Sequence, residues 1–168
     1  RARRAVLRAG IVTGYRTALA HPNALTIFQN DDDRARLIEL GATSPGRALL
    51  FRGSGVDLAR FTPAPLPAPE AGEPIVLLPA RLLWDKGIGE FVAAARILKG
   101  EGFAARFVLS GGTSPSNPAS VQEHEVREWE REGIIEWWGH STDMPATLAR
   151  STLVVLPSFY REGLPLSL

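Results

Sequence analysis

Four short apolar runs, each followed by a polar turn and a segment suited to a helix, dominate the sequence after residue 74. The runs cover residues 75–78, 107–109, 134–138 and 153–156. Apart from Glu136, the residues of these runs are apolar and consecutive, so both faces of each predicted strand must be buried. Strands of this kind that alternate with helices form a parallel sheet with helices on both faces. The sequence therefore predicts a Rossmann-like α/β domain.

Helices are expected between these strands. They are predicted at about 87–99, from 120 to 131, and at 145–150. The second begins with Ser120, and Glu123 follows three residues later, which is the spacing of a capping box. We therefore expect Ser120 to be the N-cap of that helix.

The first 62 residues carry a different pattern. Residues 1–20 hold five arginines and no acid, and Leu7, Ile11 and Tyr15 recur every four residues. This basic helix either packs on a domain surface, which is the simpler interpretation, or lies on an anionic membrane. The remaining predicted elements are strands at 24–28 and 48–51 and a helix capped by Asn30 and three aspartates.

A proline stands at every second position from 63 to 69, which predicts a stiff, extended linker. We therefore divide the chain into the tail of a first domain (1–62), the linker (63–73) and a second domain (74–168). The chain opens on arginine rather than methionine and stops in a Ser-Leu run, so we expect a piece of a longer protein.

The composition excludes several classes of site. The absence of cysteine rules out disulfides, thiolate nucleophiles and cysteine-ligated zinc. No G-x-x-x-x-G-K-[ST] or G-x-S-x-G run occurs, and Gly111-Gly112 lacks dinucleotide-binding spacing. The tryptophans at 129, 137 and 138 lie in an acidic region, which disfavours nucleic-acid binding. No apolar run could span a bilayer and no secretory signal occurs, so a cytoplasmic location is expected.

Ligands of such sheets bind outside the carboxyl ends of the strands. The loop after the first strand contains Arg81 and Lys86, followed by a helix start, which suits a phosphate or diphosphate. Lys86 is one of only two lysines among 19 basic residues. Two ordinary solvated side chains remain an equal alternative.

The loop after the last strand places Glu162 before Gly163 and a probable helix start. This carboxylate could bind a sugar hydroxyl, or it could cap its own helix. His140 follows a strand end and could line a pocket, although a surface position is the simpler alternative. The aspartates at 31–33 could hold a metal, but helix capping explains them better.

Gly53-Ser54-Gly55-Val56-Asp57, then Arg81 and Lys86-Gly87, Gly111, and finally Pro157-Ser158 with Glu162-Gly163-Leu164-Pro165 occur in this order. The ordered set resembles the retaining family-4 (group 1) glycosyltransferases of the GT-B fold. The sequence around Asn117 and around Glu162 is similar to that of family members that build bacterial surface polysaccharides on lipid carriers. The resemblance covers nearly the whole chain.

The resemblance implies a role for each matching residue. Arg81 and Lys86 match the pair that neutralises the leaving diphosphate, and Gly163, Leu164 and Pro165 match the segment that shapes the phosphate and sugar site. Glu162 matches the first acid of a Glu-x7-Glu motif. The second acid, which holds the ribose in the family, would fall two residues beyond the chain, and the acceptor-binding domain is represented only by its tail.

The implied reaction transfers a sugar from a nucleotide-diphospho-sugar, with UDP favoured, to a glycan or polyprenyl-linked acceptor. It proceeds with retention and without a metal or other cofactor, in the cytoplasm or peripherally at the inner face of the membrane. The fragment alone is expected to be inactive. The alternatives are an isolated nucleotide-binding module, a GT-B relative such as a nucleotide-sugar epimerase or a phosphorylase, and a domain without a ligand.

Overall fold

The computed structural model describes residues 2–53, 55–68 and 72–159 of the 168-residue chain. They form two compact units, divided between Val56 and Asp57.

The first unit is a small parallel ribbon with two helices. Its elements are α1 (Ala2–Ala18), β1 (Thr26–Phe28), α2 (Asp31–Glu39), the 3₁₀ turn η1 (Pro45–Arg47) and β2 (Ala48–Leu50). β1 and β2 pair in parallel, with Thr26 opposite Ala48. The predicted cap of the second helix is confirmed, because the Asn30 side chain accepts a hydrogen bond from the Asp33 N–H at 2.7 Å.

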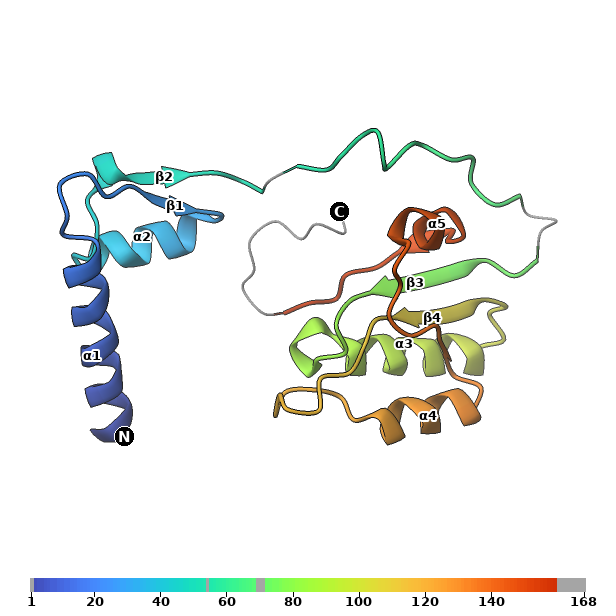
Figure 1. Ribbon diagram of the computed structural model, residues 1–168. Coiled ribbons are helices and arrows are strands. Elements are labelled where there is room, and N and C mark those ends of the chain that lie inside the picture. The colour runs from blue at the N-terminus through green and yellow to red at the C-terminus, as the bar shows by residue number, and fades with distance from the viewer. Residues whose placement is uncertain (1, 54, 69–71, 160–168) are drawn as a thin grey trace. The chain divides into compact units, whose positions relative to one another are not determined.

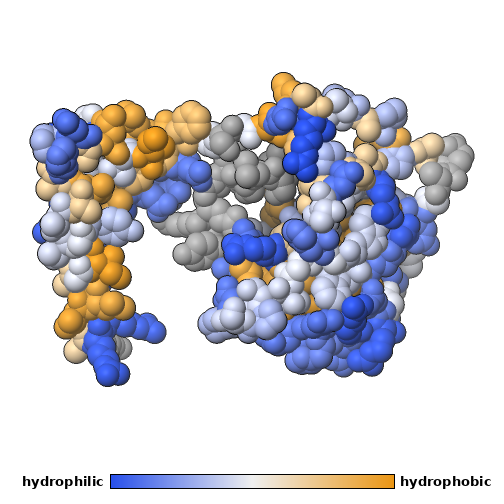
Figure 2. Space-filling model, in the orientation of Figure 1, coloured by the Kyte–Doolittle hydropathy of each residue, from blue (hydrophilic) through white to orange (hydrophobic). Residues whose placement is uncertain are grey.

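Helix α1 buries none of its residues within this unit. Leu7 and Ile11, on the apolar face predicted from the sequence, are 66% and 50% exposed. Figure 2 shows hydrophobic residues at the surface along this helix and beside β1 and β2. Among the described residues, no helix combines the length and the apolar character needed to cross a membrane.

The second unit contains the predicted parallel sheet. Its strands are β3 (Ile75–Pro79), β4 (Arg106–Ser110), β5 (Glu136–Trp137) and β6 (Leu153–Val154), and its helices are α3 (Ile88–Gly100), α4 (Glu123–Arg131) and α5 (Met144–Ala149), with the 3₁₀ turn η3 (Trp84–Lys86). The order is β5-β4-β3-β6, and every pair is parallel. The arrowheads of β3 and β4 therefore point to one common edge in Figure 1.

Helices cover both faces of this sheet. On one face, Phe91 of α3 and Val126 of α4 pack in the same apolar cluster as Leu109. On the other face, Leu77 and Val108 pack with Leu148 of α5. Figure 1 shows α5 on one side of β3 and α3 and α4 on the other. The α/β fold with helices on both faces is confirmed.

The strand order reverses after β5. The chain moves outward from β3 to β4 and β5, and then returns past β3 to place β6 on its other side. β6 pairs directly with β3, with Val76 opposite Leu153. The loops that follow the first and last strands are therefore neighbours, as the sequence predicted.

The predicted cap of α4 is wrong. The helix begins at Glu123, and its capping box pairs Gln122 with Glu125 rather than Ser120 with Glu123. Ser120 lies before the helix and is 2% exposed. Its hydroxyl accepts a hydrogen bond from the Ser114 N–H at 2.9 Å and lies 3.3 Å from the Leu82 carbonyl, so it braces loops instead.

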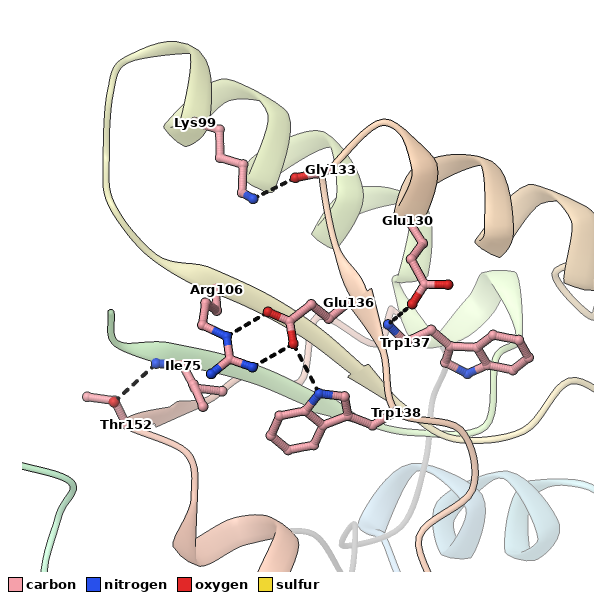
Figure 3. Close-up of polar contacts among 9 residues, drawn as sticks. All are labelled: Ile75, Lys99, Arg106, Glu130, Gly133, Glu136, Trp137, Trp138 and Thr152. Carbon is pink, nitrogen blue, oxygen red and sulfur yellow. Dashed lines mark hydrogen bonds and ion pairs between the residues drawn. The ribbon is translucent and has the colours of Figure 1, made fainter. Parts of the chain in front are cut away.

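Side chains join the strands at the amino end of the sheet (Figure 3). The Arg106 guanidinium donates two hydrogen bonds to the Glu136 carboxylate, at 2.6 and 2.7 Å, and Trp138 Nε1 donates to the same carboxylate at 3.2 Å. The hydrogen bond from Arg106 lowers the pKa of Glu136 despite partial burial. The same bond raises the pKa of Arg106. We call Arg106, Glu136 and Trp138 the amino-end clamp.

Candidate functional site at the carboxyl edge of the sheet

The loop after β3 carries the two cations predicted to bind a diphosphate. Arg81 lies two residues past the end of β3 and is exposed, whereas Lys86 is half-buried at the end of η3. Gly87 then adopts a left-handed conformation, with φ 76° and ψ 26°, and α3 begins at Ile88. Both cations therefore lie at the carboxyl edge, in one loop that leads into a helix.

Gly111 fixes the geometry of this edge. Its N–H donates to the Gly139 carbonyl at 2.8 Å, and its carbonyl accepts from Trp137 Nε1 at 2.9 Å. A Cβ atom placed on Gly111 would lie 1.8 Å from the Ala80 carbonyl oxygen. The residue is therefore required because backbone passes beside it, and the structure shows it as a packing position within the edge.

His140 lies beside the same loop. It is exposed and follows Gly139, whose φ is 68°. A Cβ atom on Gly112 would lie 3.9 Å from the His140 Cβ, so the two residues are in ordinary contact range. The structure thus brings the loops after β3, β4 and β5 together at one edge.

A further loop supports the cation-bearing loop. Leu83 and Ser120 form an isolated antiparallel bridge, and the Val121 N–H donates to the Leu82 carbonyl at 2.9 Å. The Trp84 N–H donates to the Ala119 carbonyl at 2.9 Å. The sequence pattern of residues 119–121 does not reveal this role. The Asn117-Pro118 turn before them predicts a loop, but it does not indicate which residues that loop contacts.

Two backbone amides of the loop that carries Arg81 and Lys86 donate hydrogen bonds within that loop. The Lys86 N–H donates to the Leu83 carbonyl at 3.0 Å, and the Gly87 N–H donates to the Trp84 carbonyl at 3.1 Å. Gly87 leaves no open space beside this loop, because the group packed against it is the backbone of Pro157. Recognition of an anion by this loop must therefore rely on its side chains and on α3.

The remaining predicted site residues are Glu162, Gly163, Leu164 and Pro165, and they lie outside the described residues. The described chain reaches Phe159, whose N–H donates to the Asp85 carbonyl at 3.3 Å. The segment that leads to Glu162 therefore contacts the cation-bearing loop.

Within the described ranges, no group of three or more His, Asp or Glu side chains is arranged to hold a metal ion. Asp31 instead pairs with Arg52 at 2.8 Å and lies in the first turn of α2. The acidic triplet is therefore explained as part of a helix start.

Three cavities form elsewhere in the second unit. The largest, of about 640 Å³, is almost wholly apolar and lies between α3 and β6. A second, of about 310 Å³, separates residues 61–67 from α5, and a third, of about 510 Å³, adjoins Arg106 and Arg150. Neither Arg81 nor Lys86 lines any of the three, so the candidate site is defined by the loops that meet at the carboxyl edge.

Most of this chain matches the sequence of a known relative. It is 30% identical over 151 residues to the Campylobacter jejuni N,N'-diacetylbacillosaminyl-diphospho-undecaprenol alpha-1,3-N-acetylgalactosaminyltransferase. The match covers 84% of this chain and 38% of that enzyme, so the chain spans well under half of its relative's length.

Solved structures share the fold. The Anabaena protein Alr3699/HepE, solved in complex with UDP and glucose, matches with a TM-score of 0.64 at 18% identity, over 90% of this chain and 43% of that one. WaaG, a glycosyltransferase involved in lipopolysaccharide biosynthesis, matches with a TM-score of 0.60 at 13% identity, over 79% of this chain and 38% of that one. The fold is thus that of GT-B enzymes. The family model described as "Glycosyl transferases group 1" matches residues 73–168, and the chain belongs to that family.

Proposed function

We propose that this chain is the donor-binding part of a glycosyltransferase that takes a sugar from a nucleotide-diphospho-sugar. The observation that carries the proposal is the meeting of two loops at the carboxyl edge. One carries Arg81 and Lys86, and the other leads from Phe159 towards Glu162. In a group 1 chain, this arrangement suits a diphosphate that leaves and a sugar that is transferred.

Arg81 and Lys86 supply fixed positive charge for the leaving group. Departure of a nucleoside diphosphate develops negative charge, which cations already in place stabilise without reorganisation. Lys86 is half-buried, so its charge is screened less by solvent than that of a fully exposed lysine. Two protein cations can neutralise the diphosphate, and the proposed reaction needs no metal or other cofactor.

Glu162 is assigned to the other side of the reacting bond. The sugar develops oxocarbenium-like positive charge as the diphosphate leaves, and a carboxylate stabilises or orients it. Gly163, Leu164 and Pro165 are assigned to the phosphate and sugar site that follows it, and Gly111 and His140 to the pocket wall. The proposed outcome is transfer with retention. UDP is favoured as the nucleotide, since the Anabaena structure holds UDP and glucose.

The proposed acceptor is a glycan or a polyprenyl-linked sugar. The Campylobacter relative carries a diphospho-undecaprenol acceptor in its name, which supports the lipid-linked class. Such an acceptor lies at a membrane, so the proposal includes a cytoplasmic protein that associates peripherally with the inner face. The exposed, acid-free surface of α1 has the charge that an anionic lipid headgroup attracts.

The two lysines offer a matched test of donor binding. In Lys86→Ala, the affinity for UDP or GDP should fall about tenfold or more, because a charged hydrogen-bond donor to the diphosphate is lost. Lys99 serves as the control. Its ammonium donates to the Gly133 carbonyl at 2.6 Å, at the opposite end of α3 (Figure 3).

Calorimetric titration of the wild-type chain and both variants measures the difference. Lys99→Ala should bind the nucleotide as the wild type does. Addition of EDTA should leave the affinity unchanged, because no metal takes part in the proposed site. Equal affinities of the Lys86→Ala and wild-type proteins would remove Lys86 from the site, and a wild-type chain that binds neither nucleotide would contradict donor binding.

A further inference from the structure

Segments far apart in the sequence meet on one carbonyl oxygen. The carbonyl of Asp85 accepts a hydrogen bond from the Ser158 hydroxyl at 3.2 Å and another from the Phe159 N–H at 3.3 Å. Ser158 and Asp85 are 73 positions apart. Asp85 is the middle residue of η3 and directly precedes Lys86. The loop after β6 is therefore joined to the backbone of the cation-bearing loop.

Gly87 makes room for the same segment. A Cβ atom at this position would lie 2.3 Å from the Pro157 carbonyl oxygen and 2.8 Å from the Pro157 Cγ. Contacts under 3.0 Å require one partner to move, and the nearest atom here is backbone. Any side chain at position 87 must therefore displace Pro157.

These contacts begin where the sheet ends. Val155 donates to the Leu77 carbonyl at 2.9 Å, one residue past β6. Beyond that bond the chain leaves the sheet, and residues 157–159 contact the turn at 85–87. The direction in which the chain leaves the sheet is therefore set by this turn.

We propose that residues 85–87 form a seat for residues 157–159, and that Gly87 and Ser158 are positioning residues for donor binding. The inference rests on the proposed function. Lys86 lies within the seat, and Glu162 follows Phe159 by three residues in the sequence. The seat therefore couples the cation assigned to the diphosphate with the segment that leads to the carboxylate assigned to the sugar. Neither positioning residue needs to touch the donor.

Gly87→Ala tests the seat together with a control for backbone strain. Alanine at position 87 would have to adopt a positive φ, and its Cβ would also clash with Pro157. Gly102 has φ 81° with nothing within 4 Å of an added Cβ, so Gly102→Ala has the strain alone. Titration with UDP and GDP should show at least a tenfold loss of affinity in Gly87→Ala and wild-type affinity in Gly102→Ala. Equal losses in the two variants would overturn the seat.

Ser158 tests the hydrogen bond directly. Ser158→Ala should weaken nucleotide binding about three- to tenfold, the effect of one lost hydrogen bond. Ser158→Thr keeps the hydroxyl and should restore affinity to within about twofold of the wild type. The melting temperature of Ser158→Ala should stay within about 2 °C of the wild type, which separates positioning from general destabilisation.

Hydrogen exchange provides a readout that does not depend on a ligand. The Phe159 amide should exchange faster in Ser158→Ala and Gly87→Ala than in the wild type, while the Val155 amide should not change. Unchanged exchange at Phe159 contradicts the seat. A wild-type chain that binds neither UDP nor GDP contradicts the proposed function and the seat with it. A wild-type chain that binds, with Gly87→Ala and Ser158→Ala binding equally well, contradicts the seat alone.

Discussion

The two ends of the sheet in the second unit are held together by different kinds of contact. At the amino end, the side chains of the amino-end clamp join neighbouring strands across a bidentate ion pair. At the carboxyl edge, backbone carbonyls and N–H groups meet directly, and Gly87 and Gly111 occur where another backbone segment passes. The amino end depends on paired side chains. The carboxyl edge depends mainly on close backbone approach at Gly87 and Gly111, with added side-chain hydrogen bonds such as that of Ser158 to the Asp85 carbonyl.

The difference follows from what each end must do. An ion pair that joins two strands occupies space, and its two charges are paired with each other. The carboxyl edge, where we propose that the donor binds, holds its loops largely through main-chain bonds. The amino end can therefore change its side chains at moderate cost, whereas the carboxyl edge has no room for an added Cβ at Gly87 or Gly111.

The largest predicted effect is at Gly111. In Gly111→Ala, the free energy of unfolding should fall by about 3 kcal/mol, because the new Cβ would lie 1.8 Å from the Ala80 carbonyl oxygen. Gly112→Ala is the matched control, since its Cβ would be 3.9 Å from the nearest atom, the His140 Cβ. Urea unfolding of both variants measures the comparison. Equal destabilisation by the two changes would show that close backbone approach is not what requires Gly111.

A smaller effect is expected at the amino-end clamp. Glu136→Gln removes the negative charge that Arg106 faces, and both side chains are 39% exposed, so the loss should be about 1 kcal/mol at neutral pH. The lowered pKa of Glu136 means that its contribution is complete above the unfolded-state pKa of about 4.3. It disappears as the pH falls through the lowered folded-state pKa.

Thermal melts of wild type and Glu136→Gln against pH measure this contribution. The two curves should be separated at pH 7, begin to approach each other below about pH 4.3, and meet as the pH falls through the lowered folded-state pKa of Glu136. A separation that persists at low pH would assign the effect to packing rather than charge.

The smallest effect is expected at Ser110, a polar residue at the carboxyl end of β4. It is 2% exposed, and its hydroxyl oxygen has no hydrogen-bond partner in the part of the chain that the structure describes. Ser110→Ala removes that unpaired group and should raise the free energy of unfolding by about 0.5 kcal/mol. Chemical denaturation measures it. A loss above about 1 kcal/mol would mean that the hydroxyl does have a partner, and that this edge also depends on side chains.

The sequence predicted the parts of this molecule that depend on local pattern. Consecutive apolar residues at 75–78 and 107–109 require burial on both faces, so the parallel sheet follows. Asn30 before three aspartates predicts a helix start for the same local reason. Because ligands of such sheets bind outside the carboxyl ends of the strands, the sequence also predicts that Arg81, Lys86 and His140 lie at one edge.

Other features depend on contacts that the sequence does not encode locally. Ser120 has the spacing of a capping residue, yet its hydroxyl faces Ser114 and Leu82, and Leu82 is 38 positions away. Gly87 precedes the start of α3, and the group packed beside it is the backbone of Pro157. Both residues thus contact a segment distant in the sequence, which a local motif does not reveal. The role of Lys86 stays a prediction, which the nucleotide titrations test, and the role of Glu162 stays a prediction as well.

The central position of β3 has a consequence for the order in which this domain can fold. A connection of moderate length joins β3 to its neighbour β4. By contrast, 73 positions separate Asp85, after β3, from Ser158, after β6. Closing a longer loop costs more entropy, so contacts of this kind form late. During synthesis, the β3–β4–β5 portion emerges first, and the carboxyl edge is completed only when β6 joins it. Nucleotide binding would therefore report that the last strand is in place.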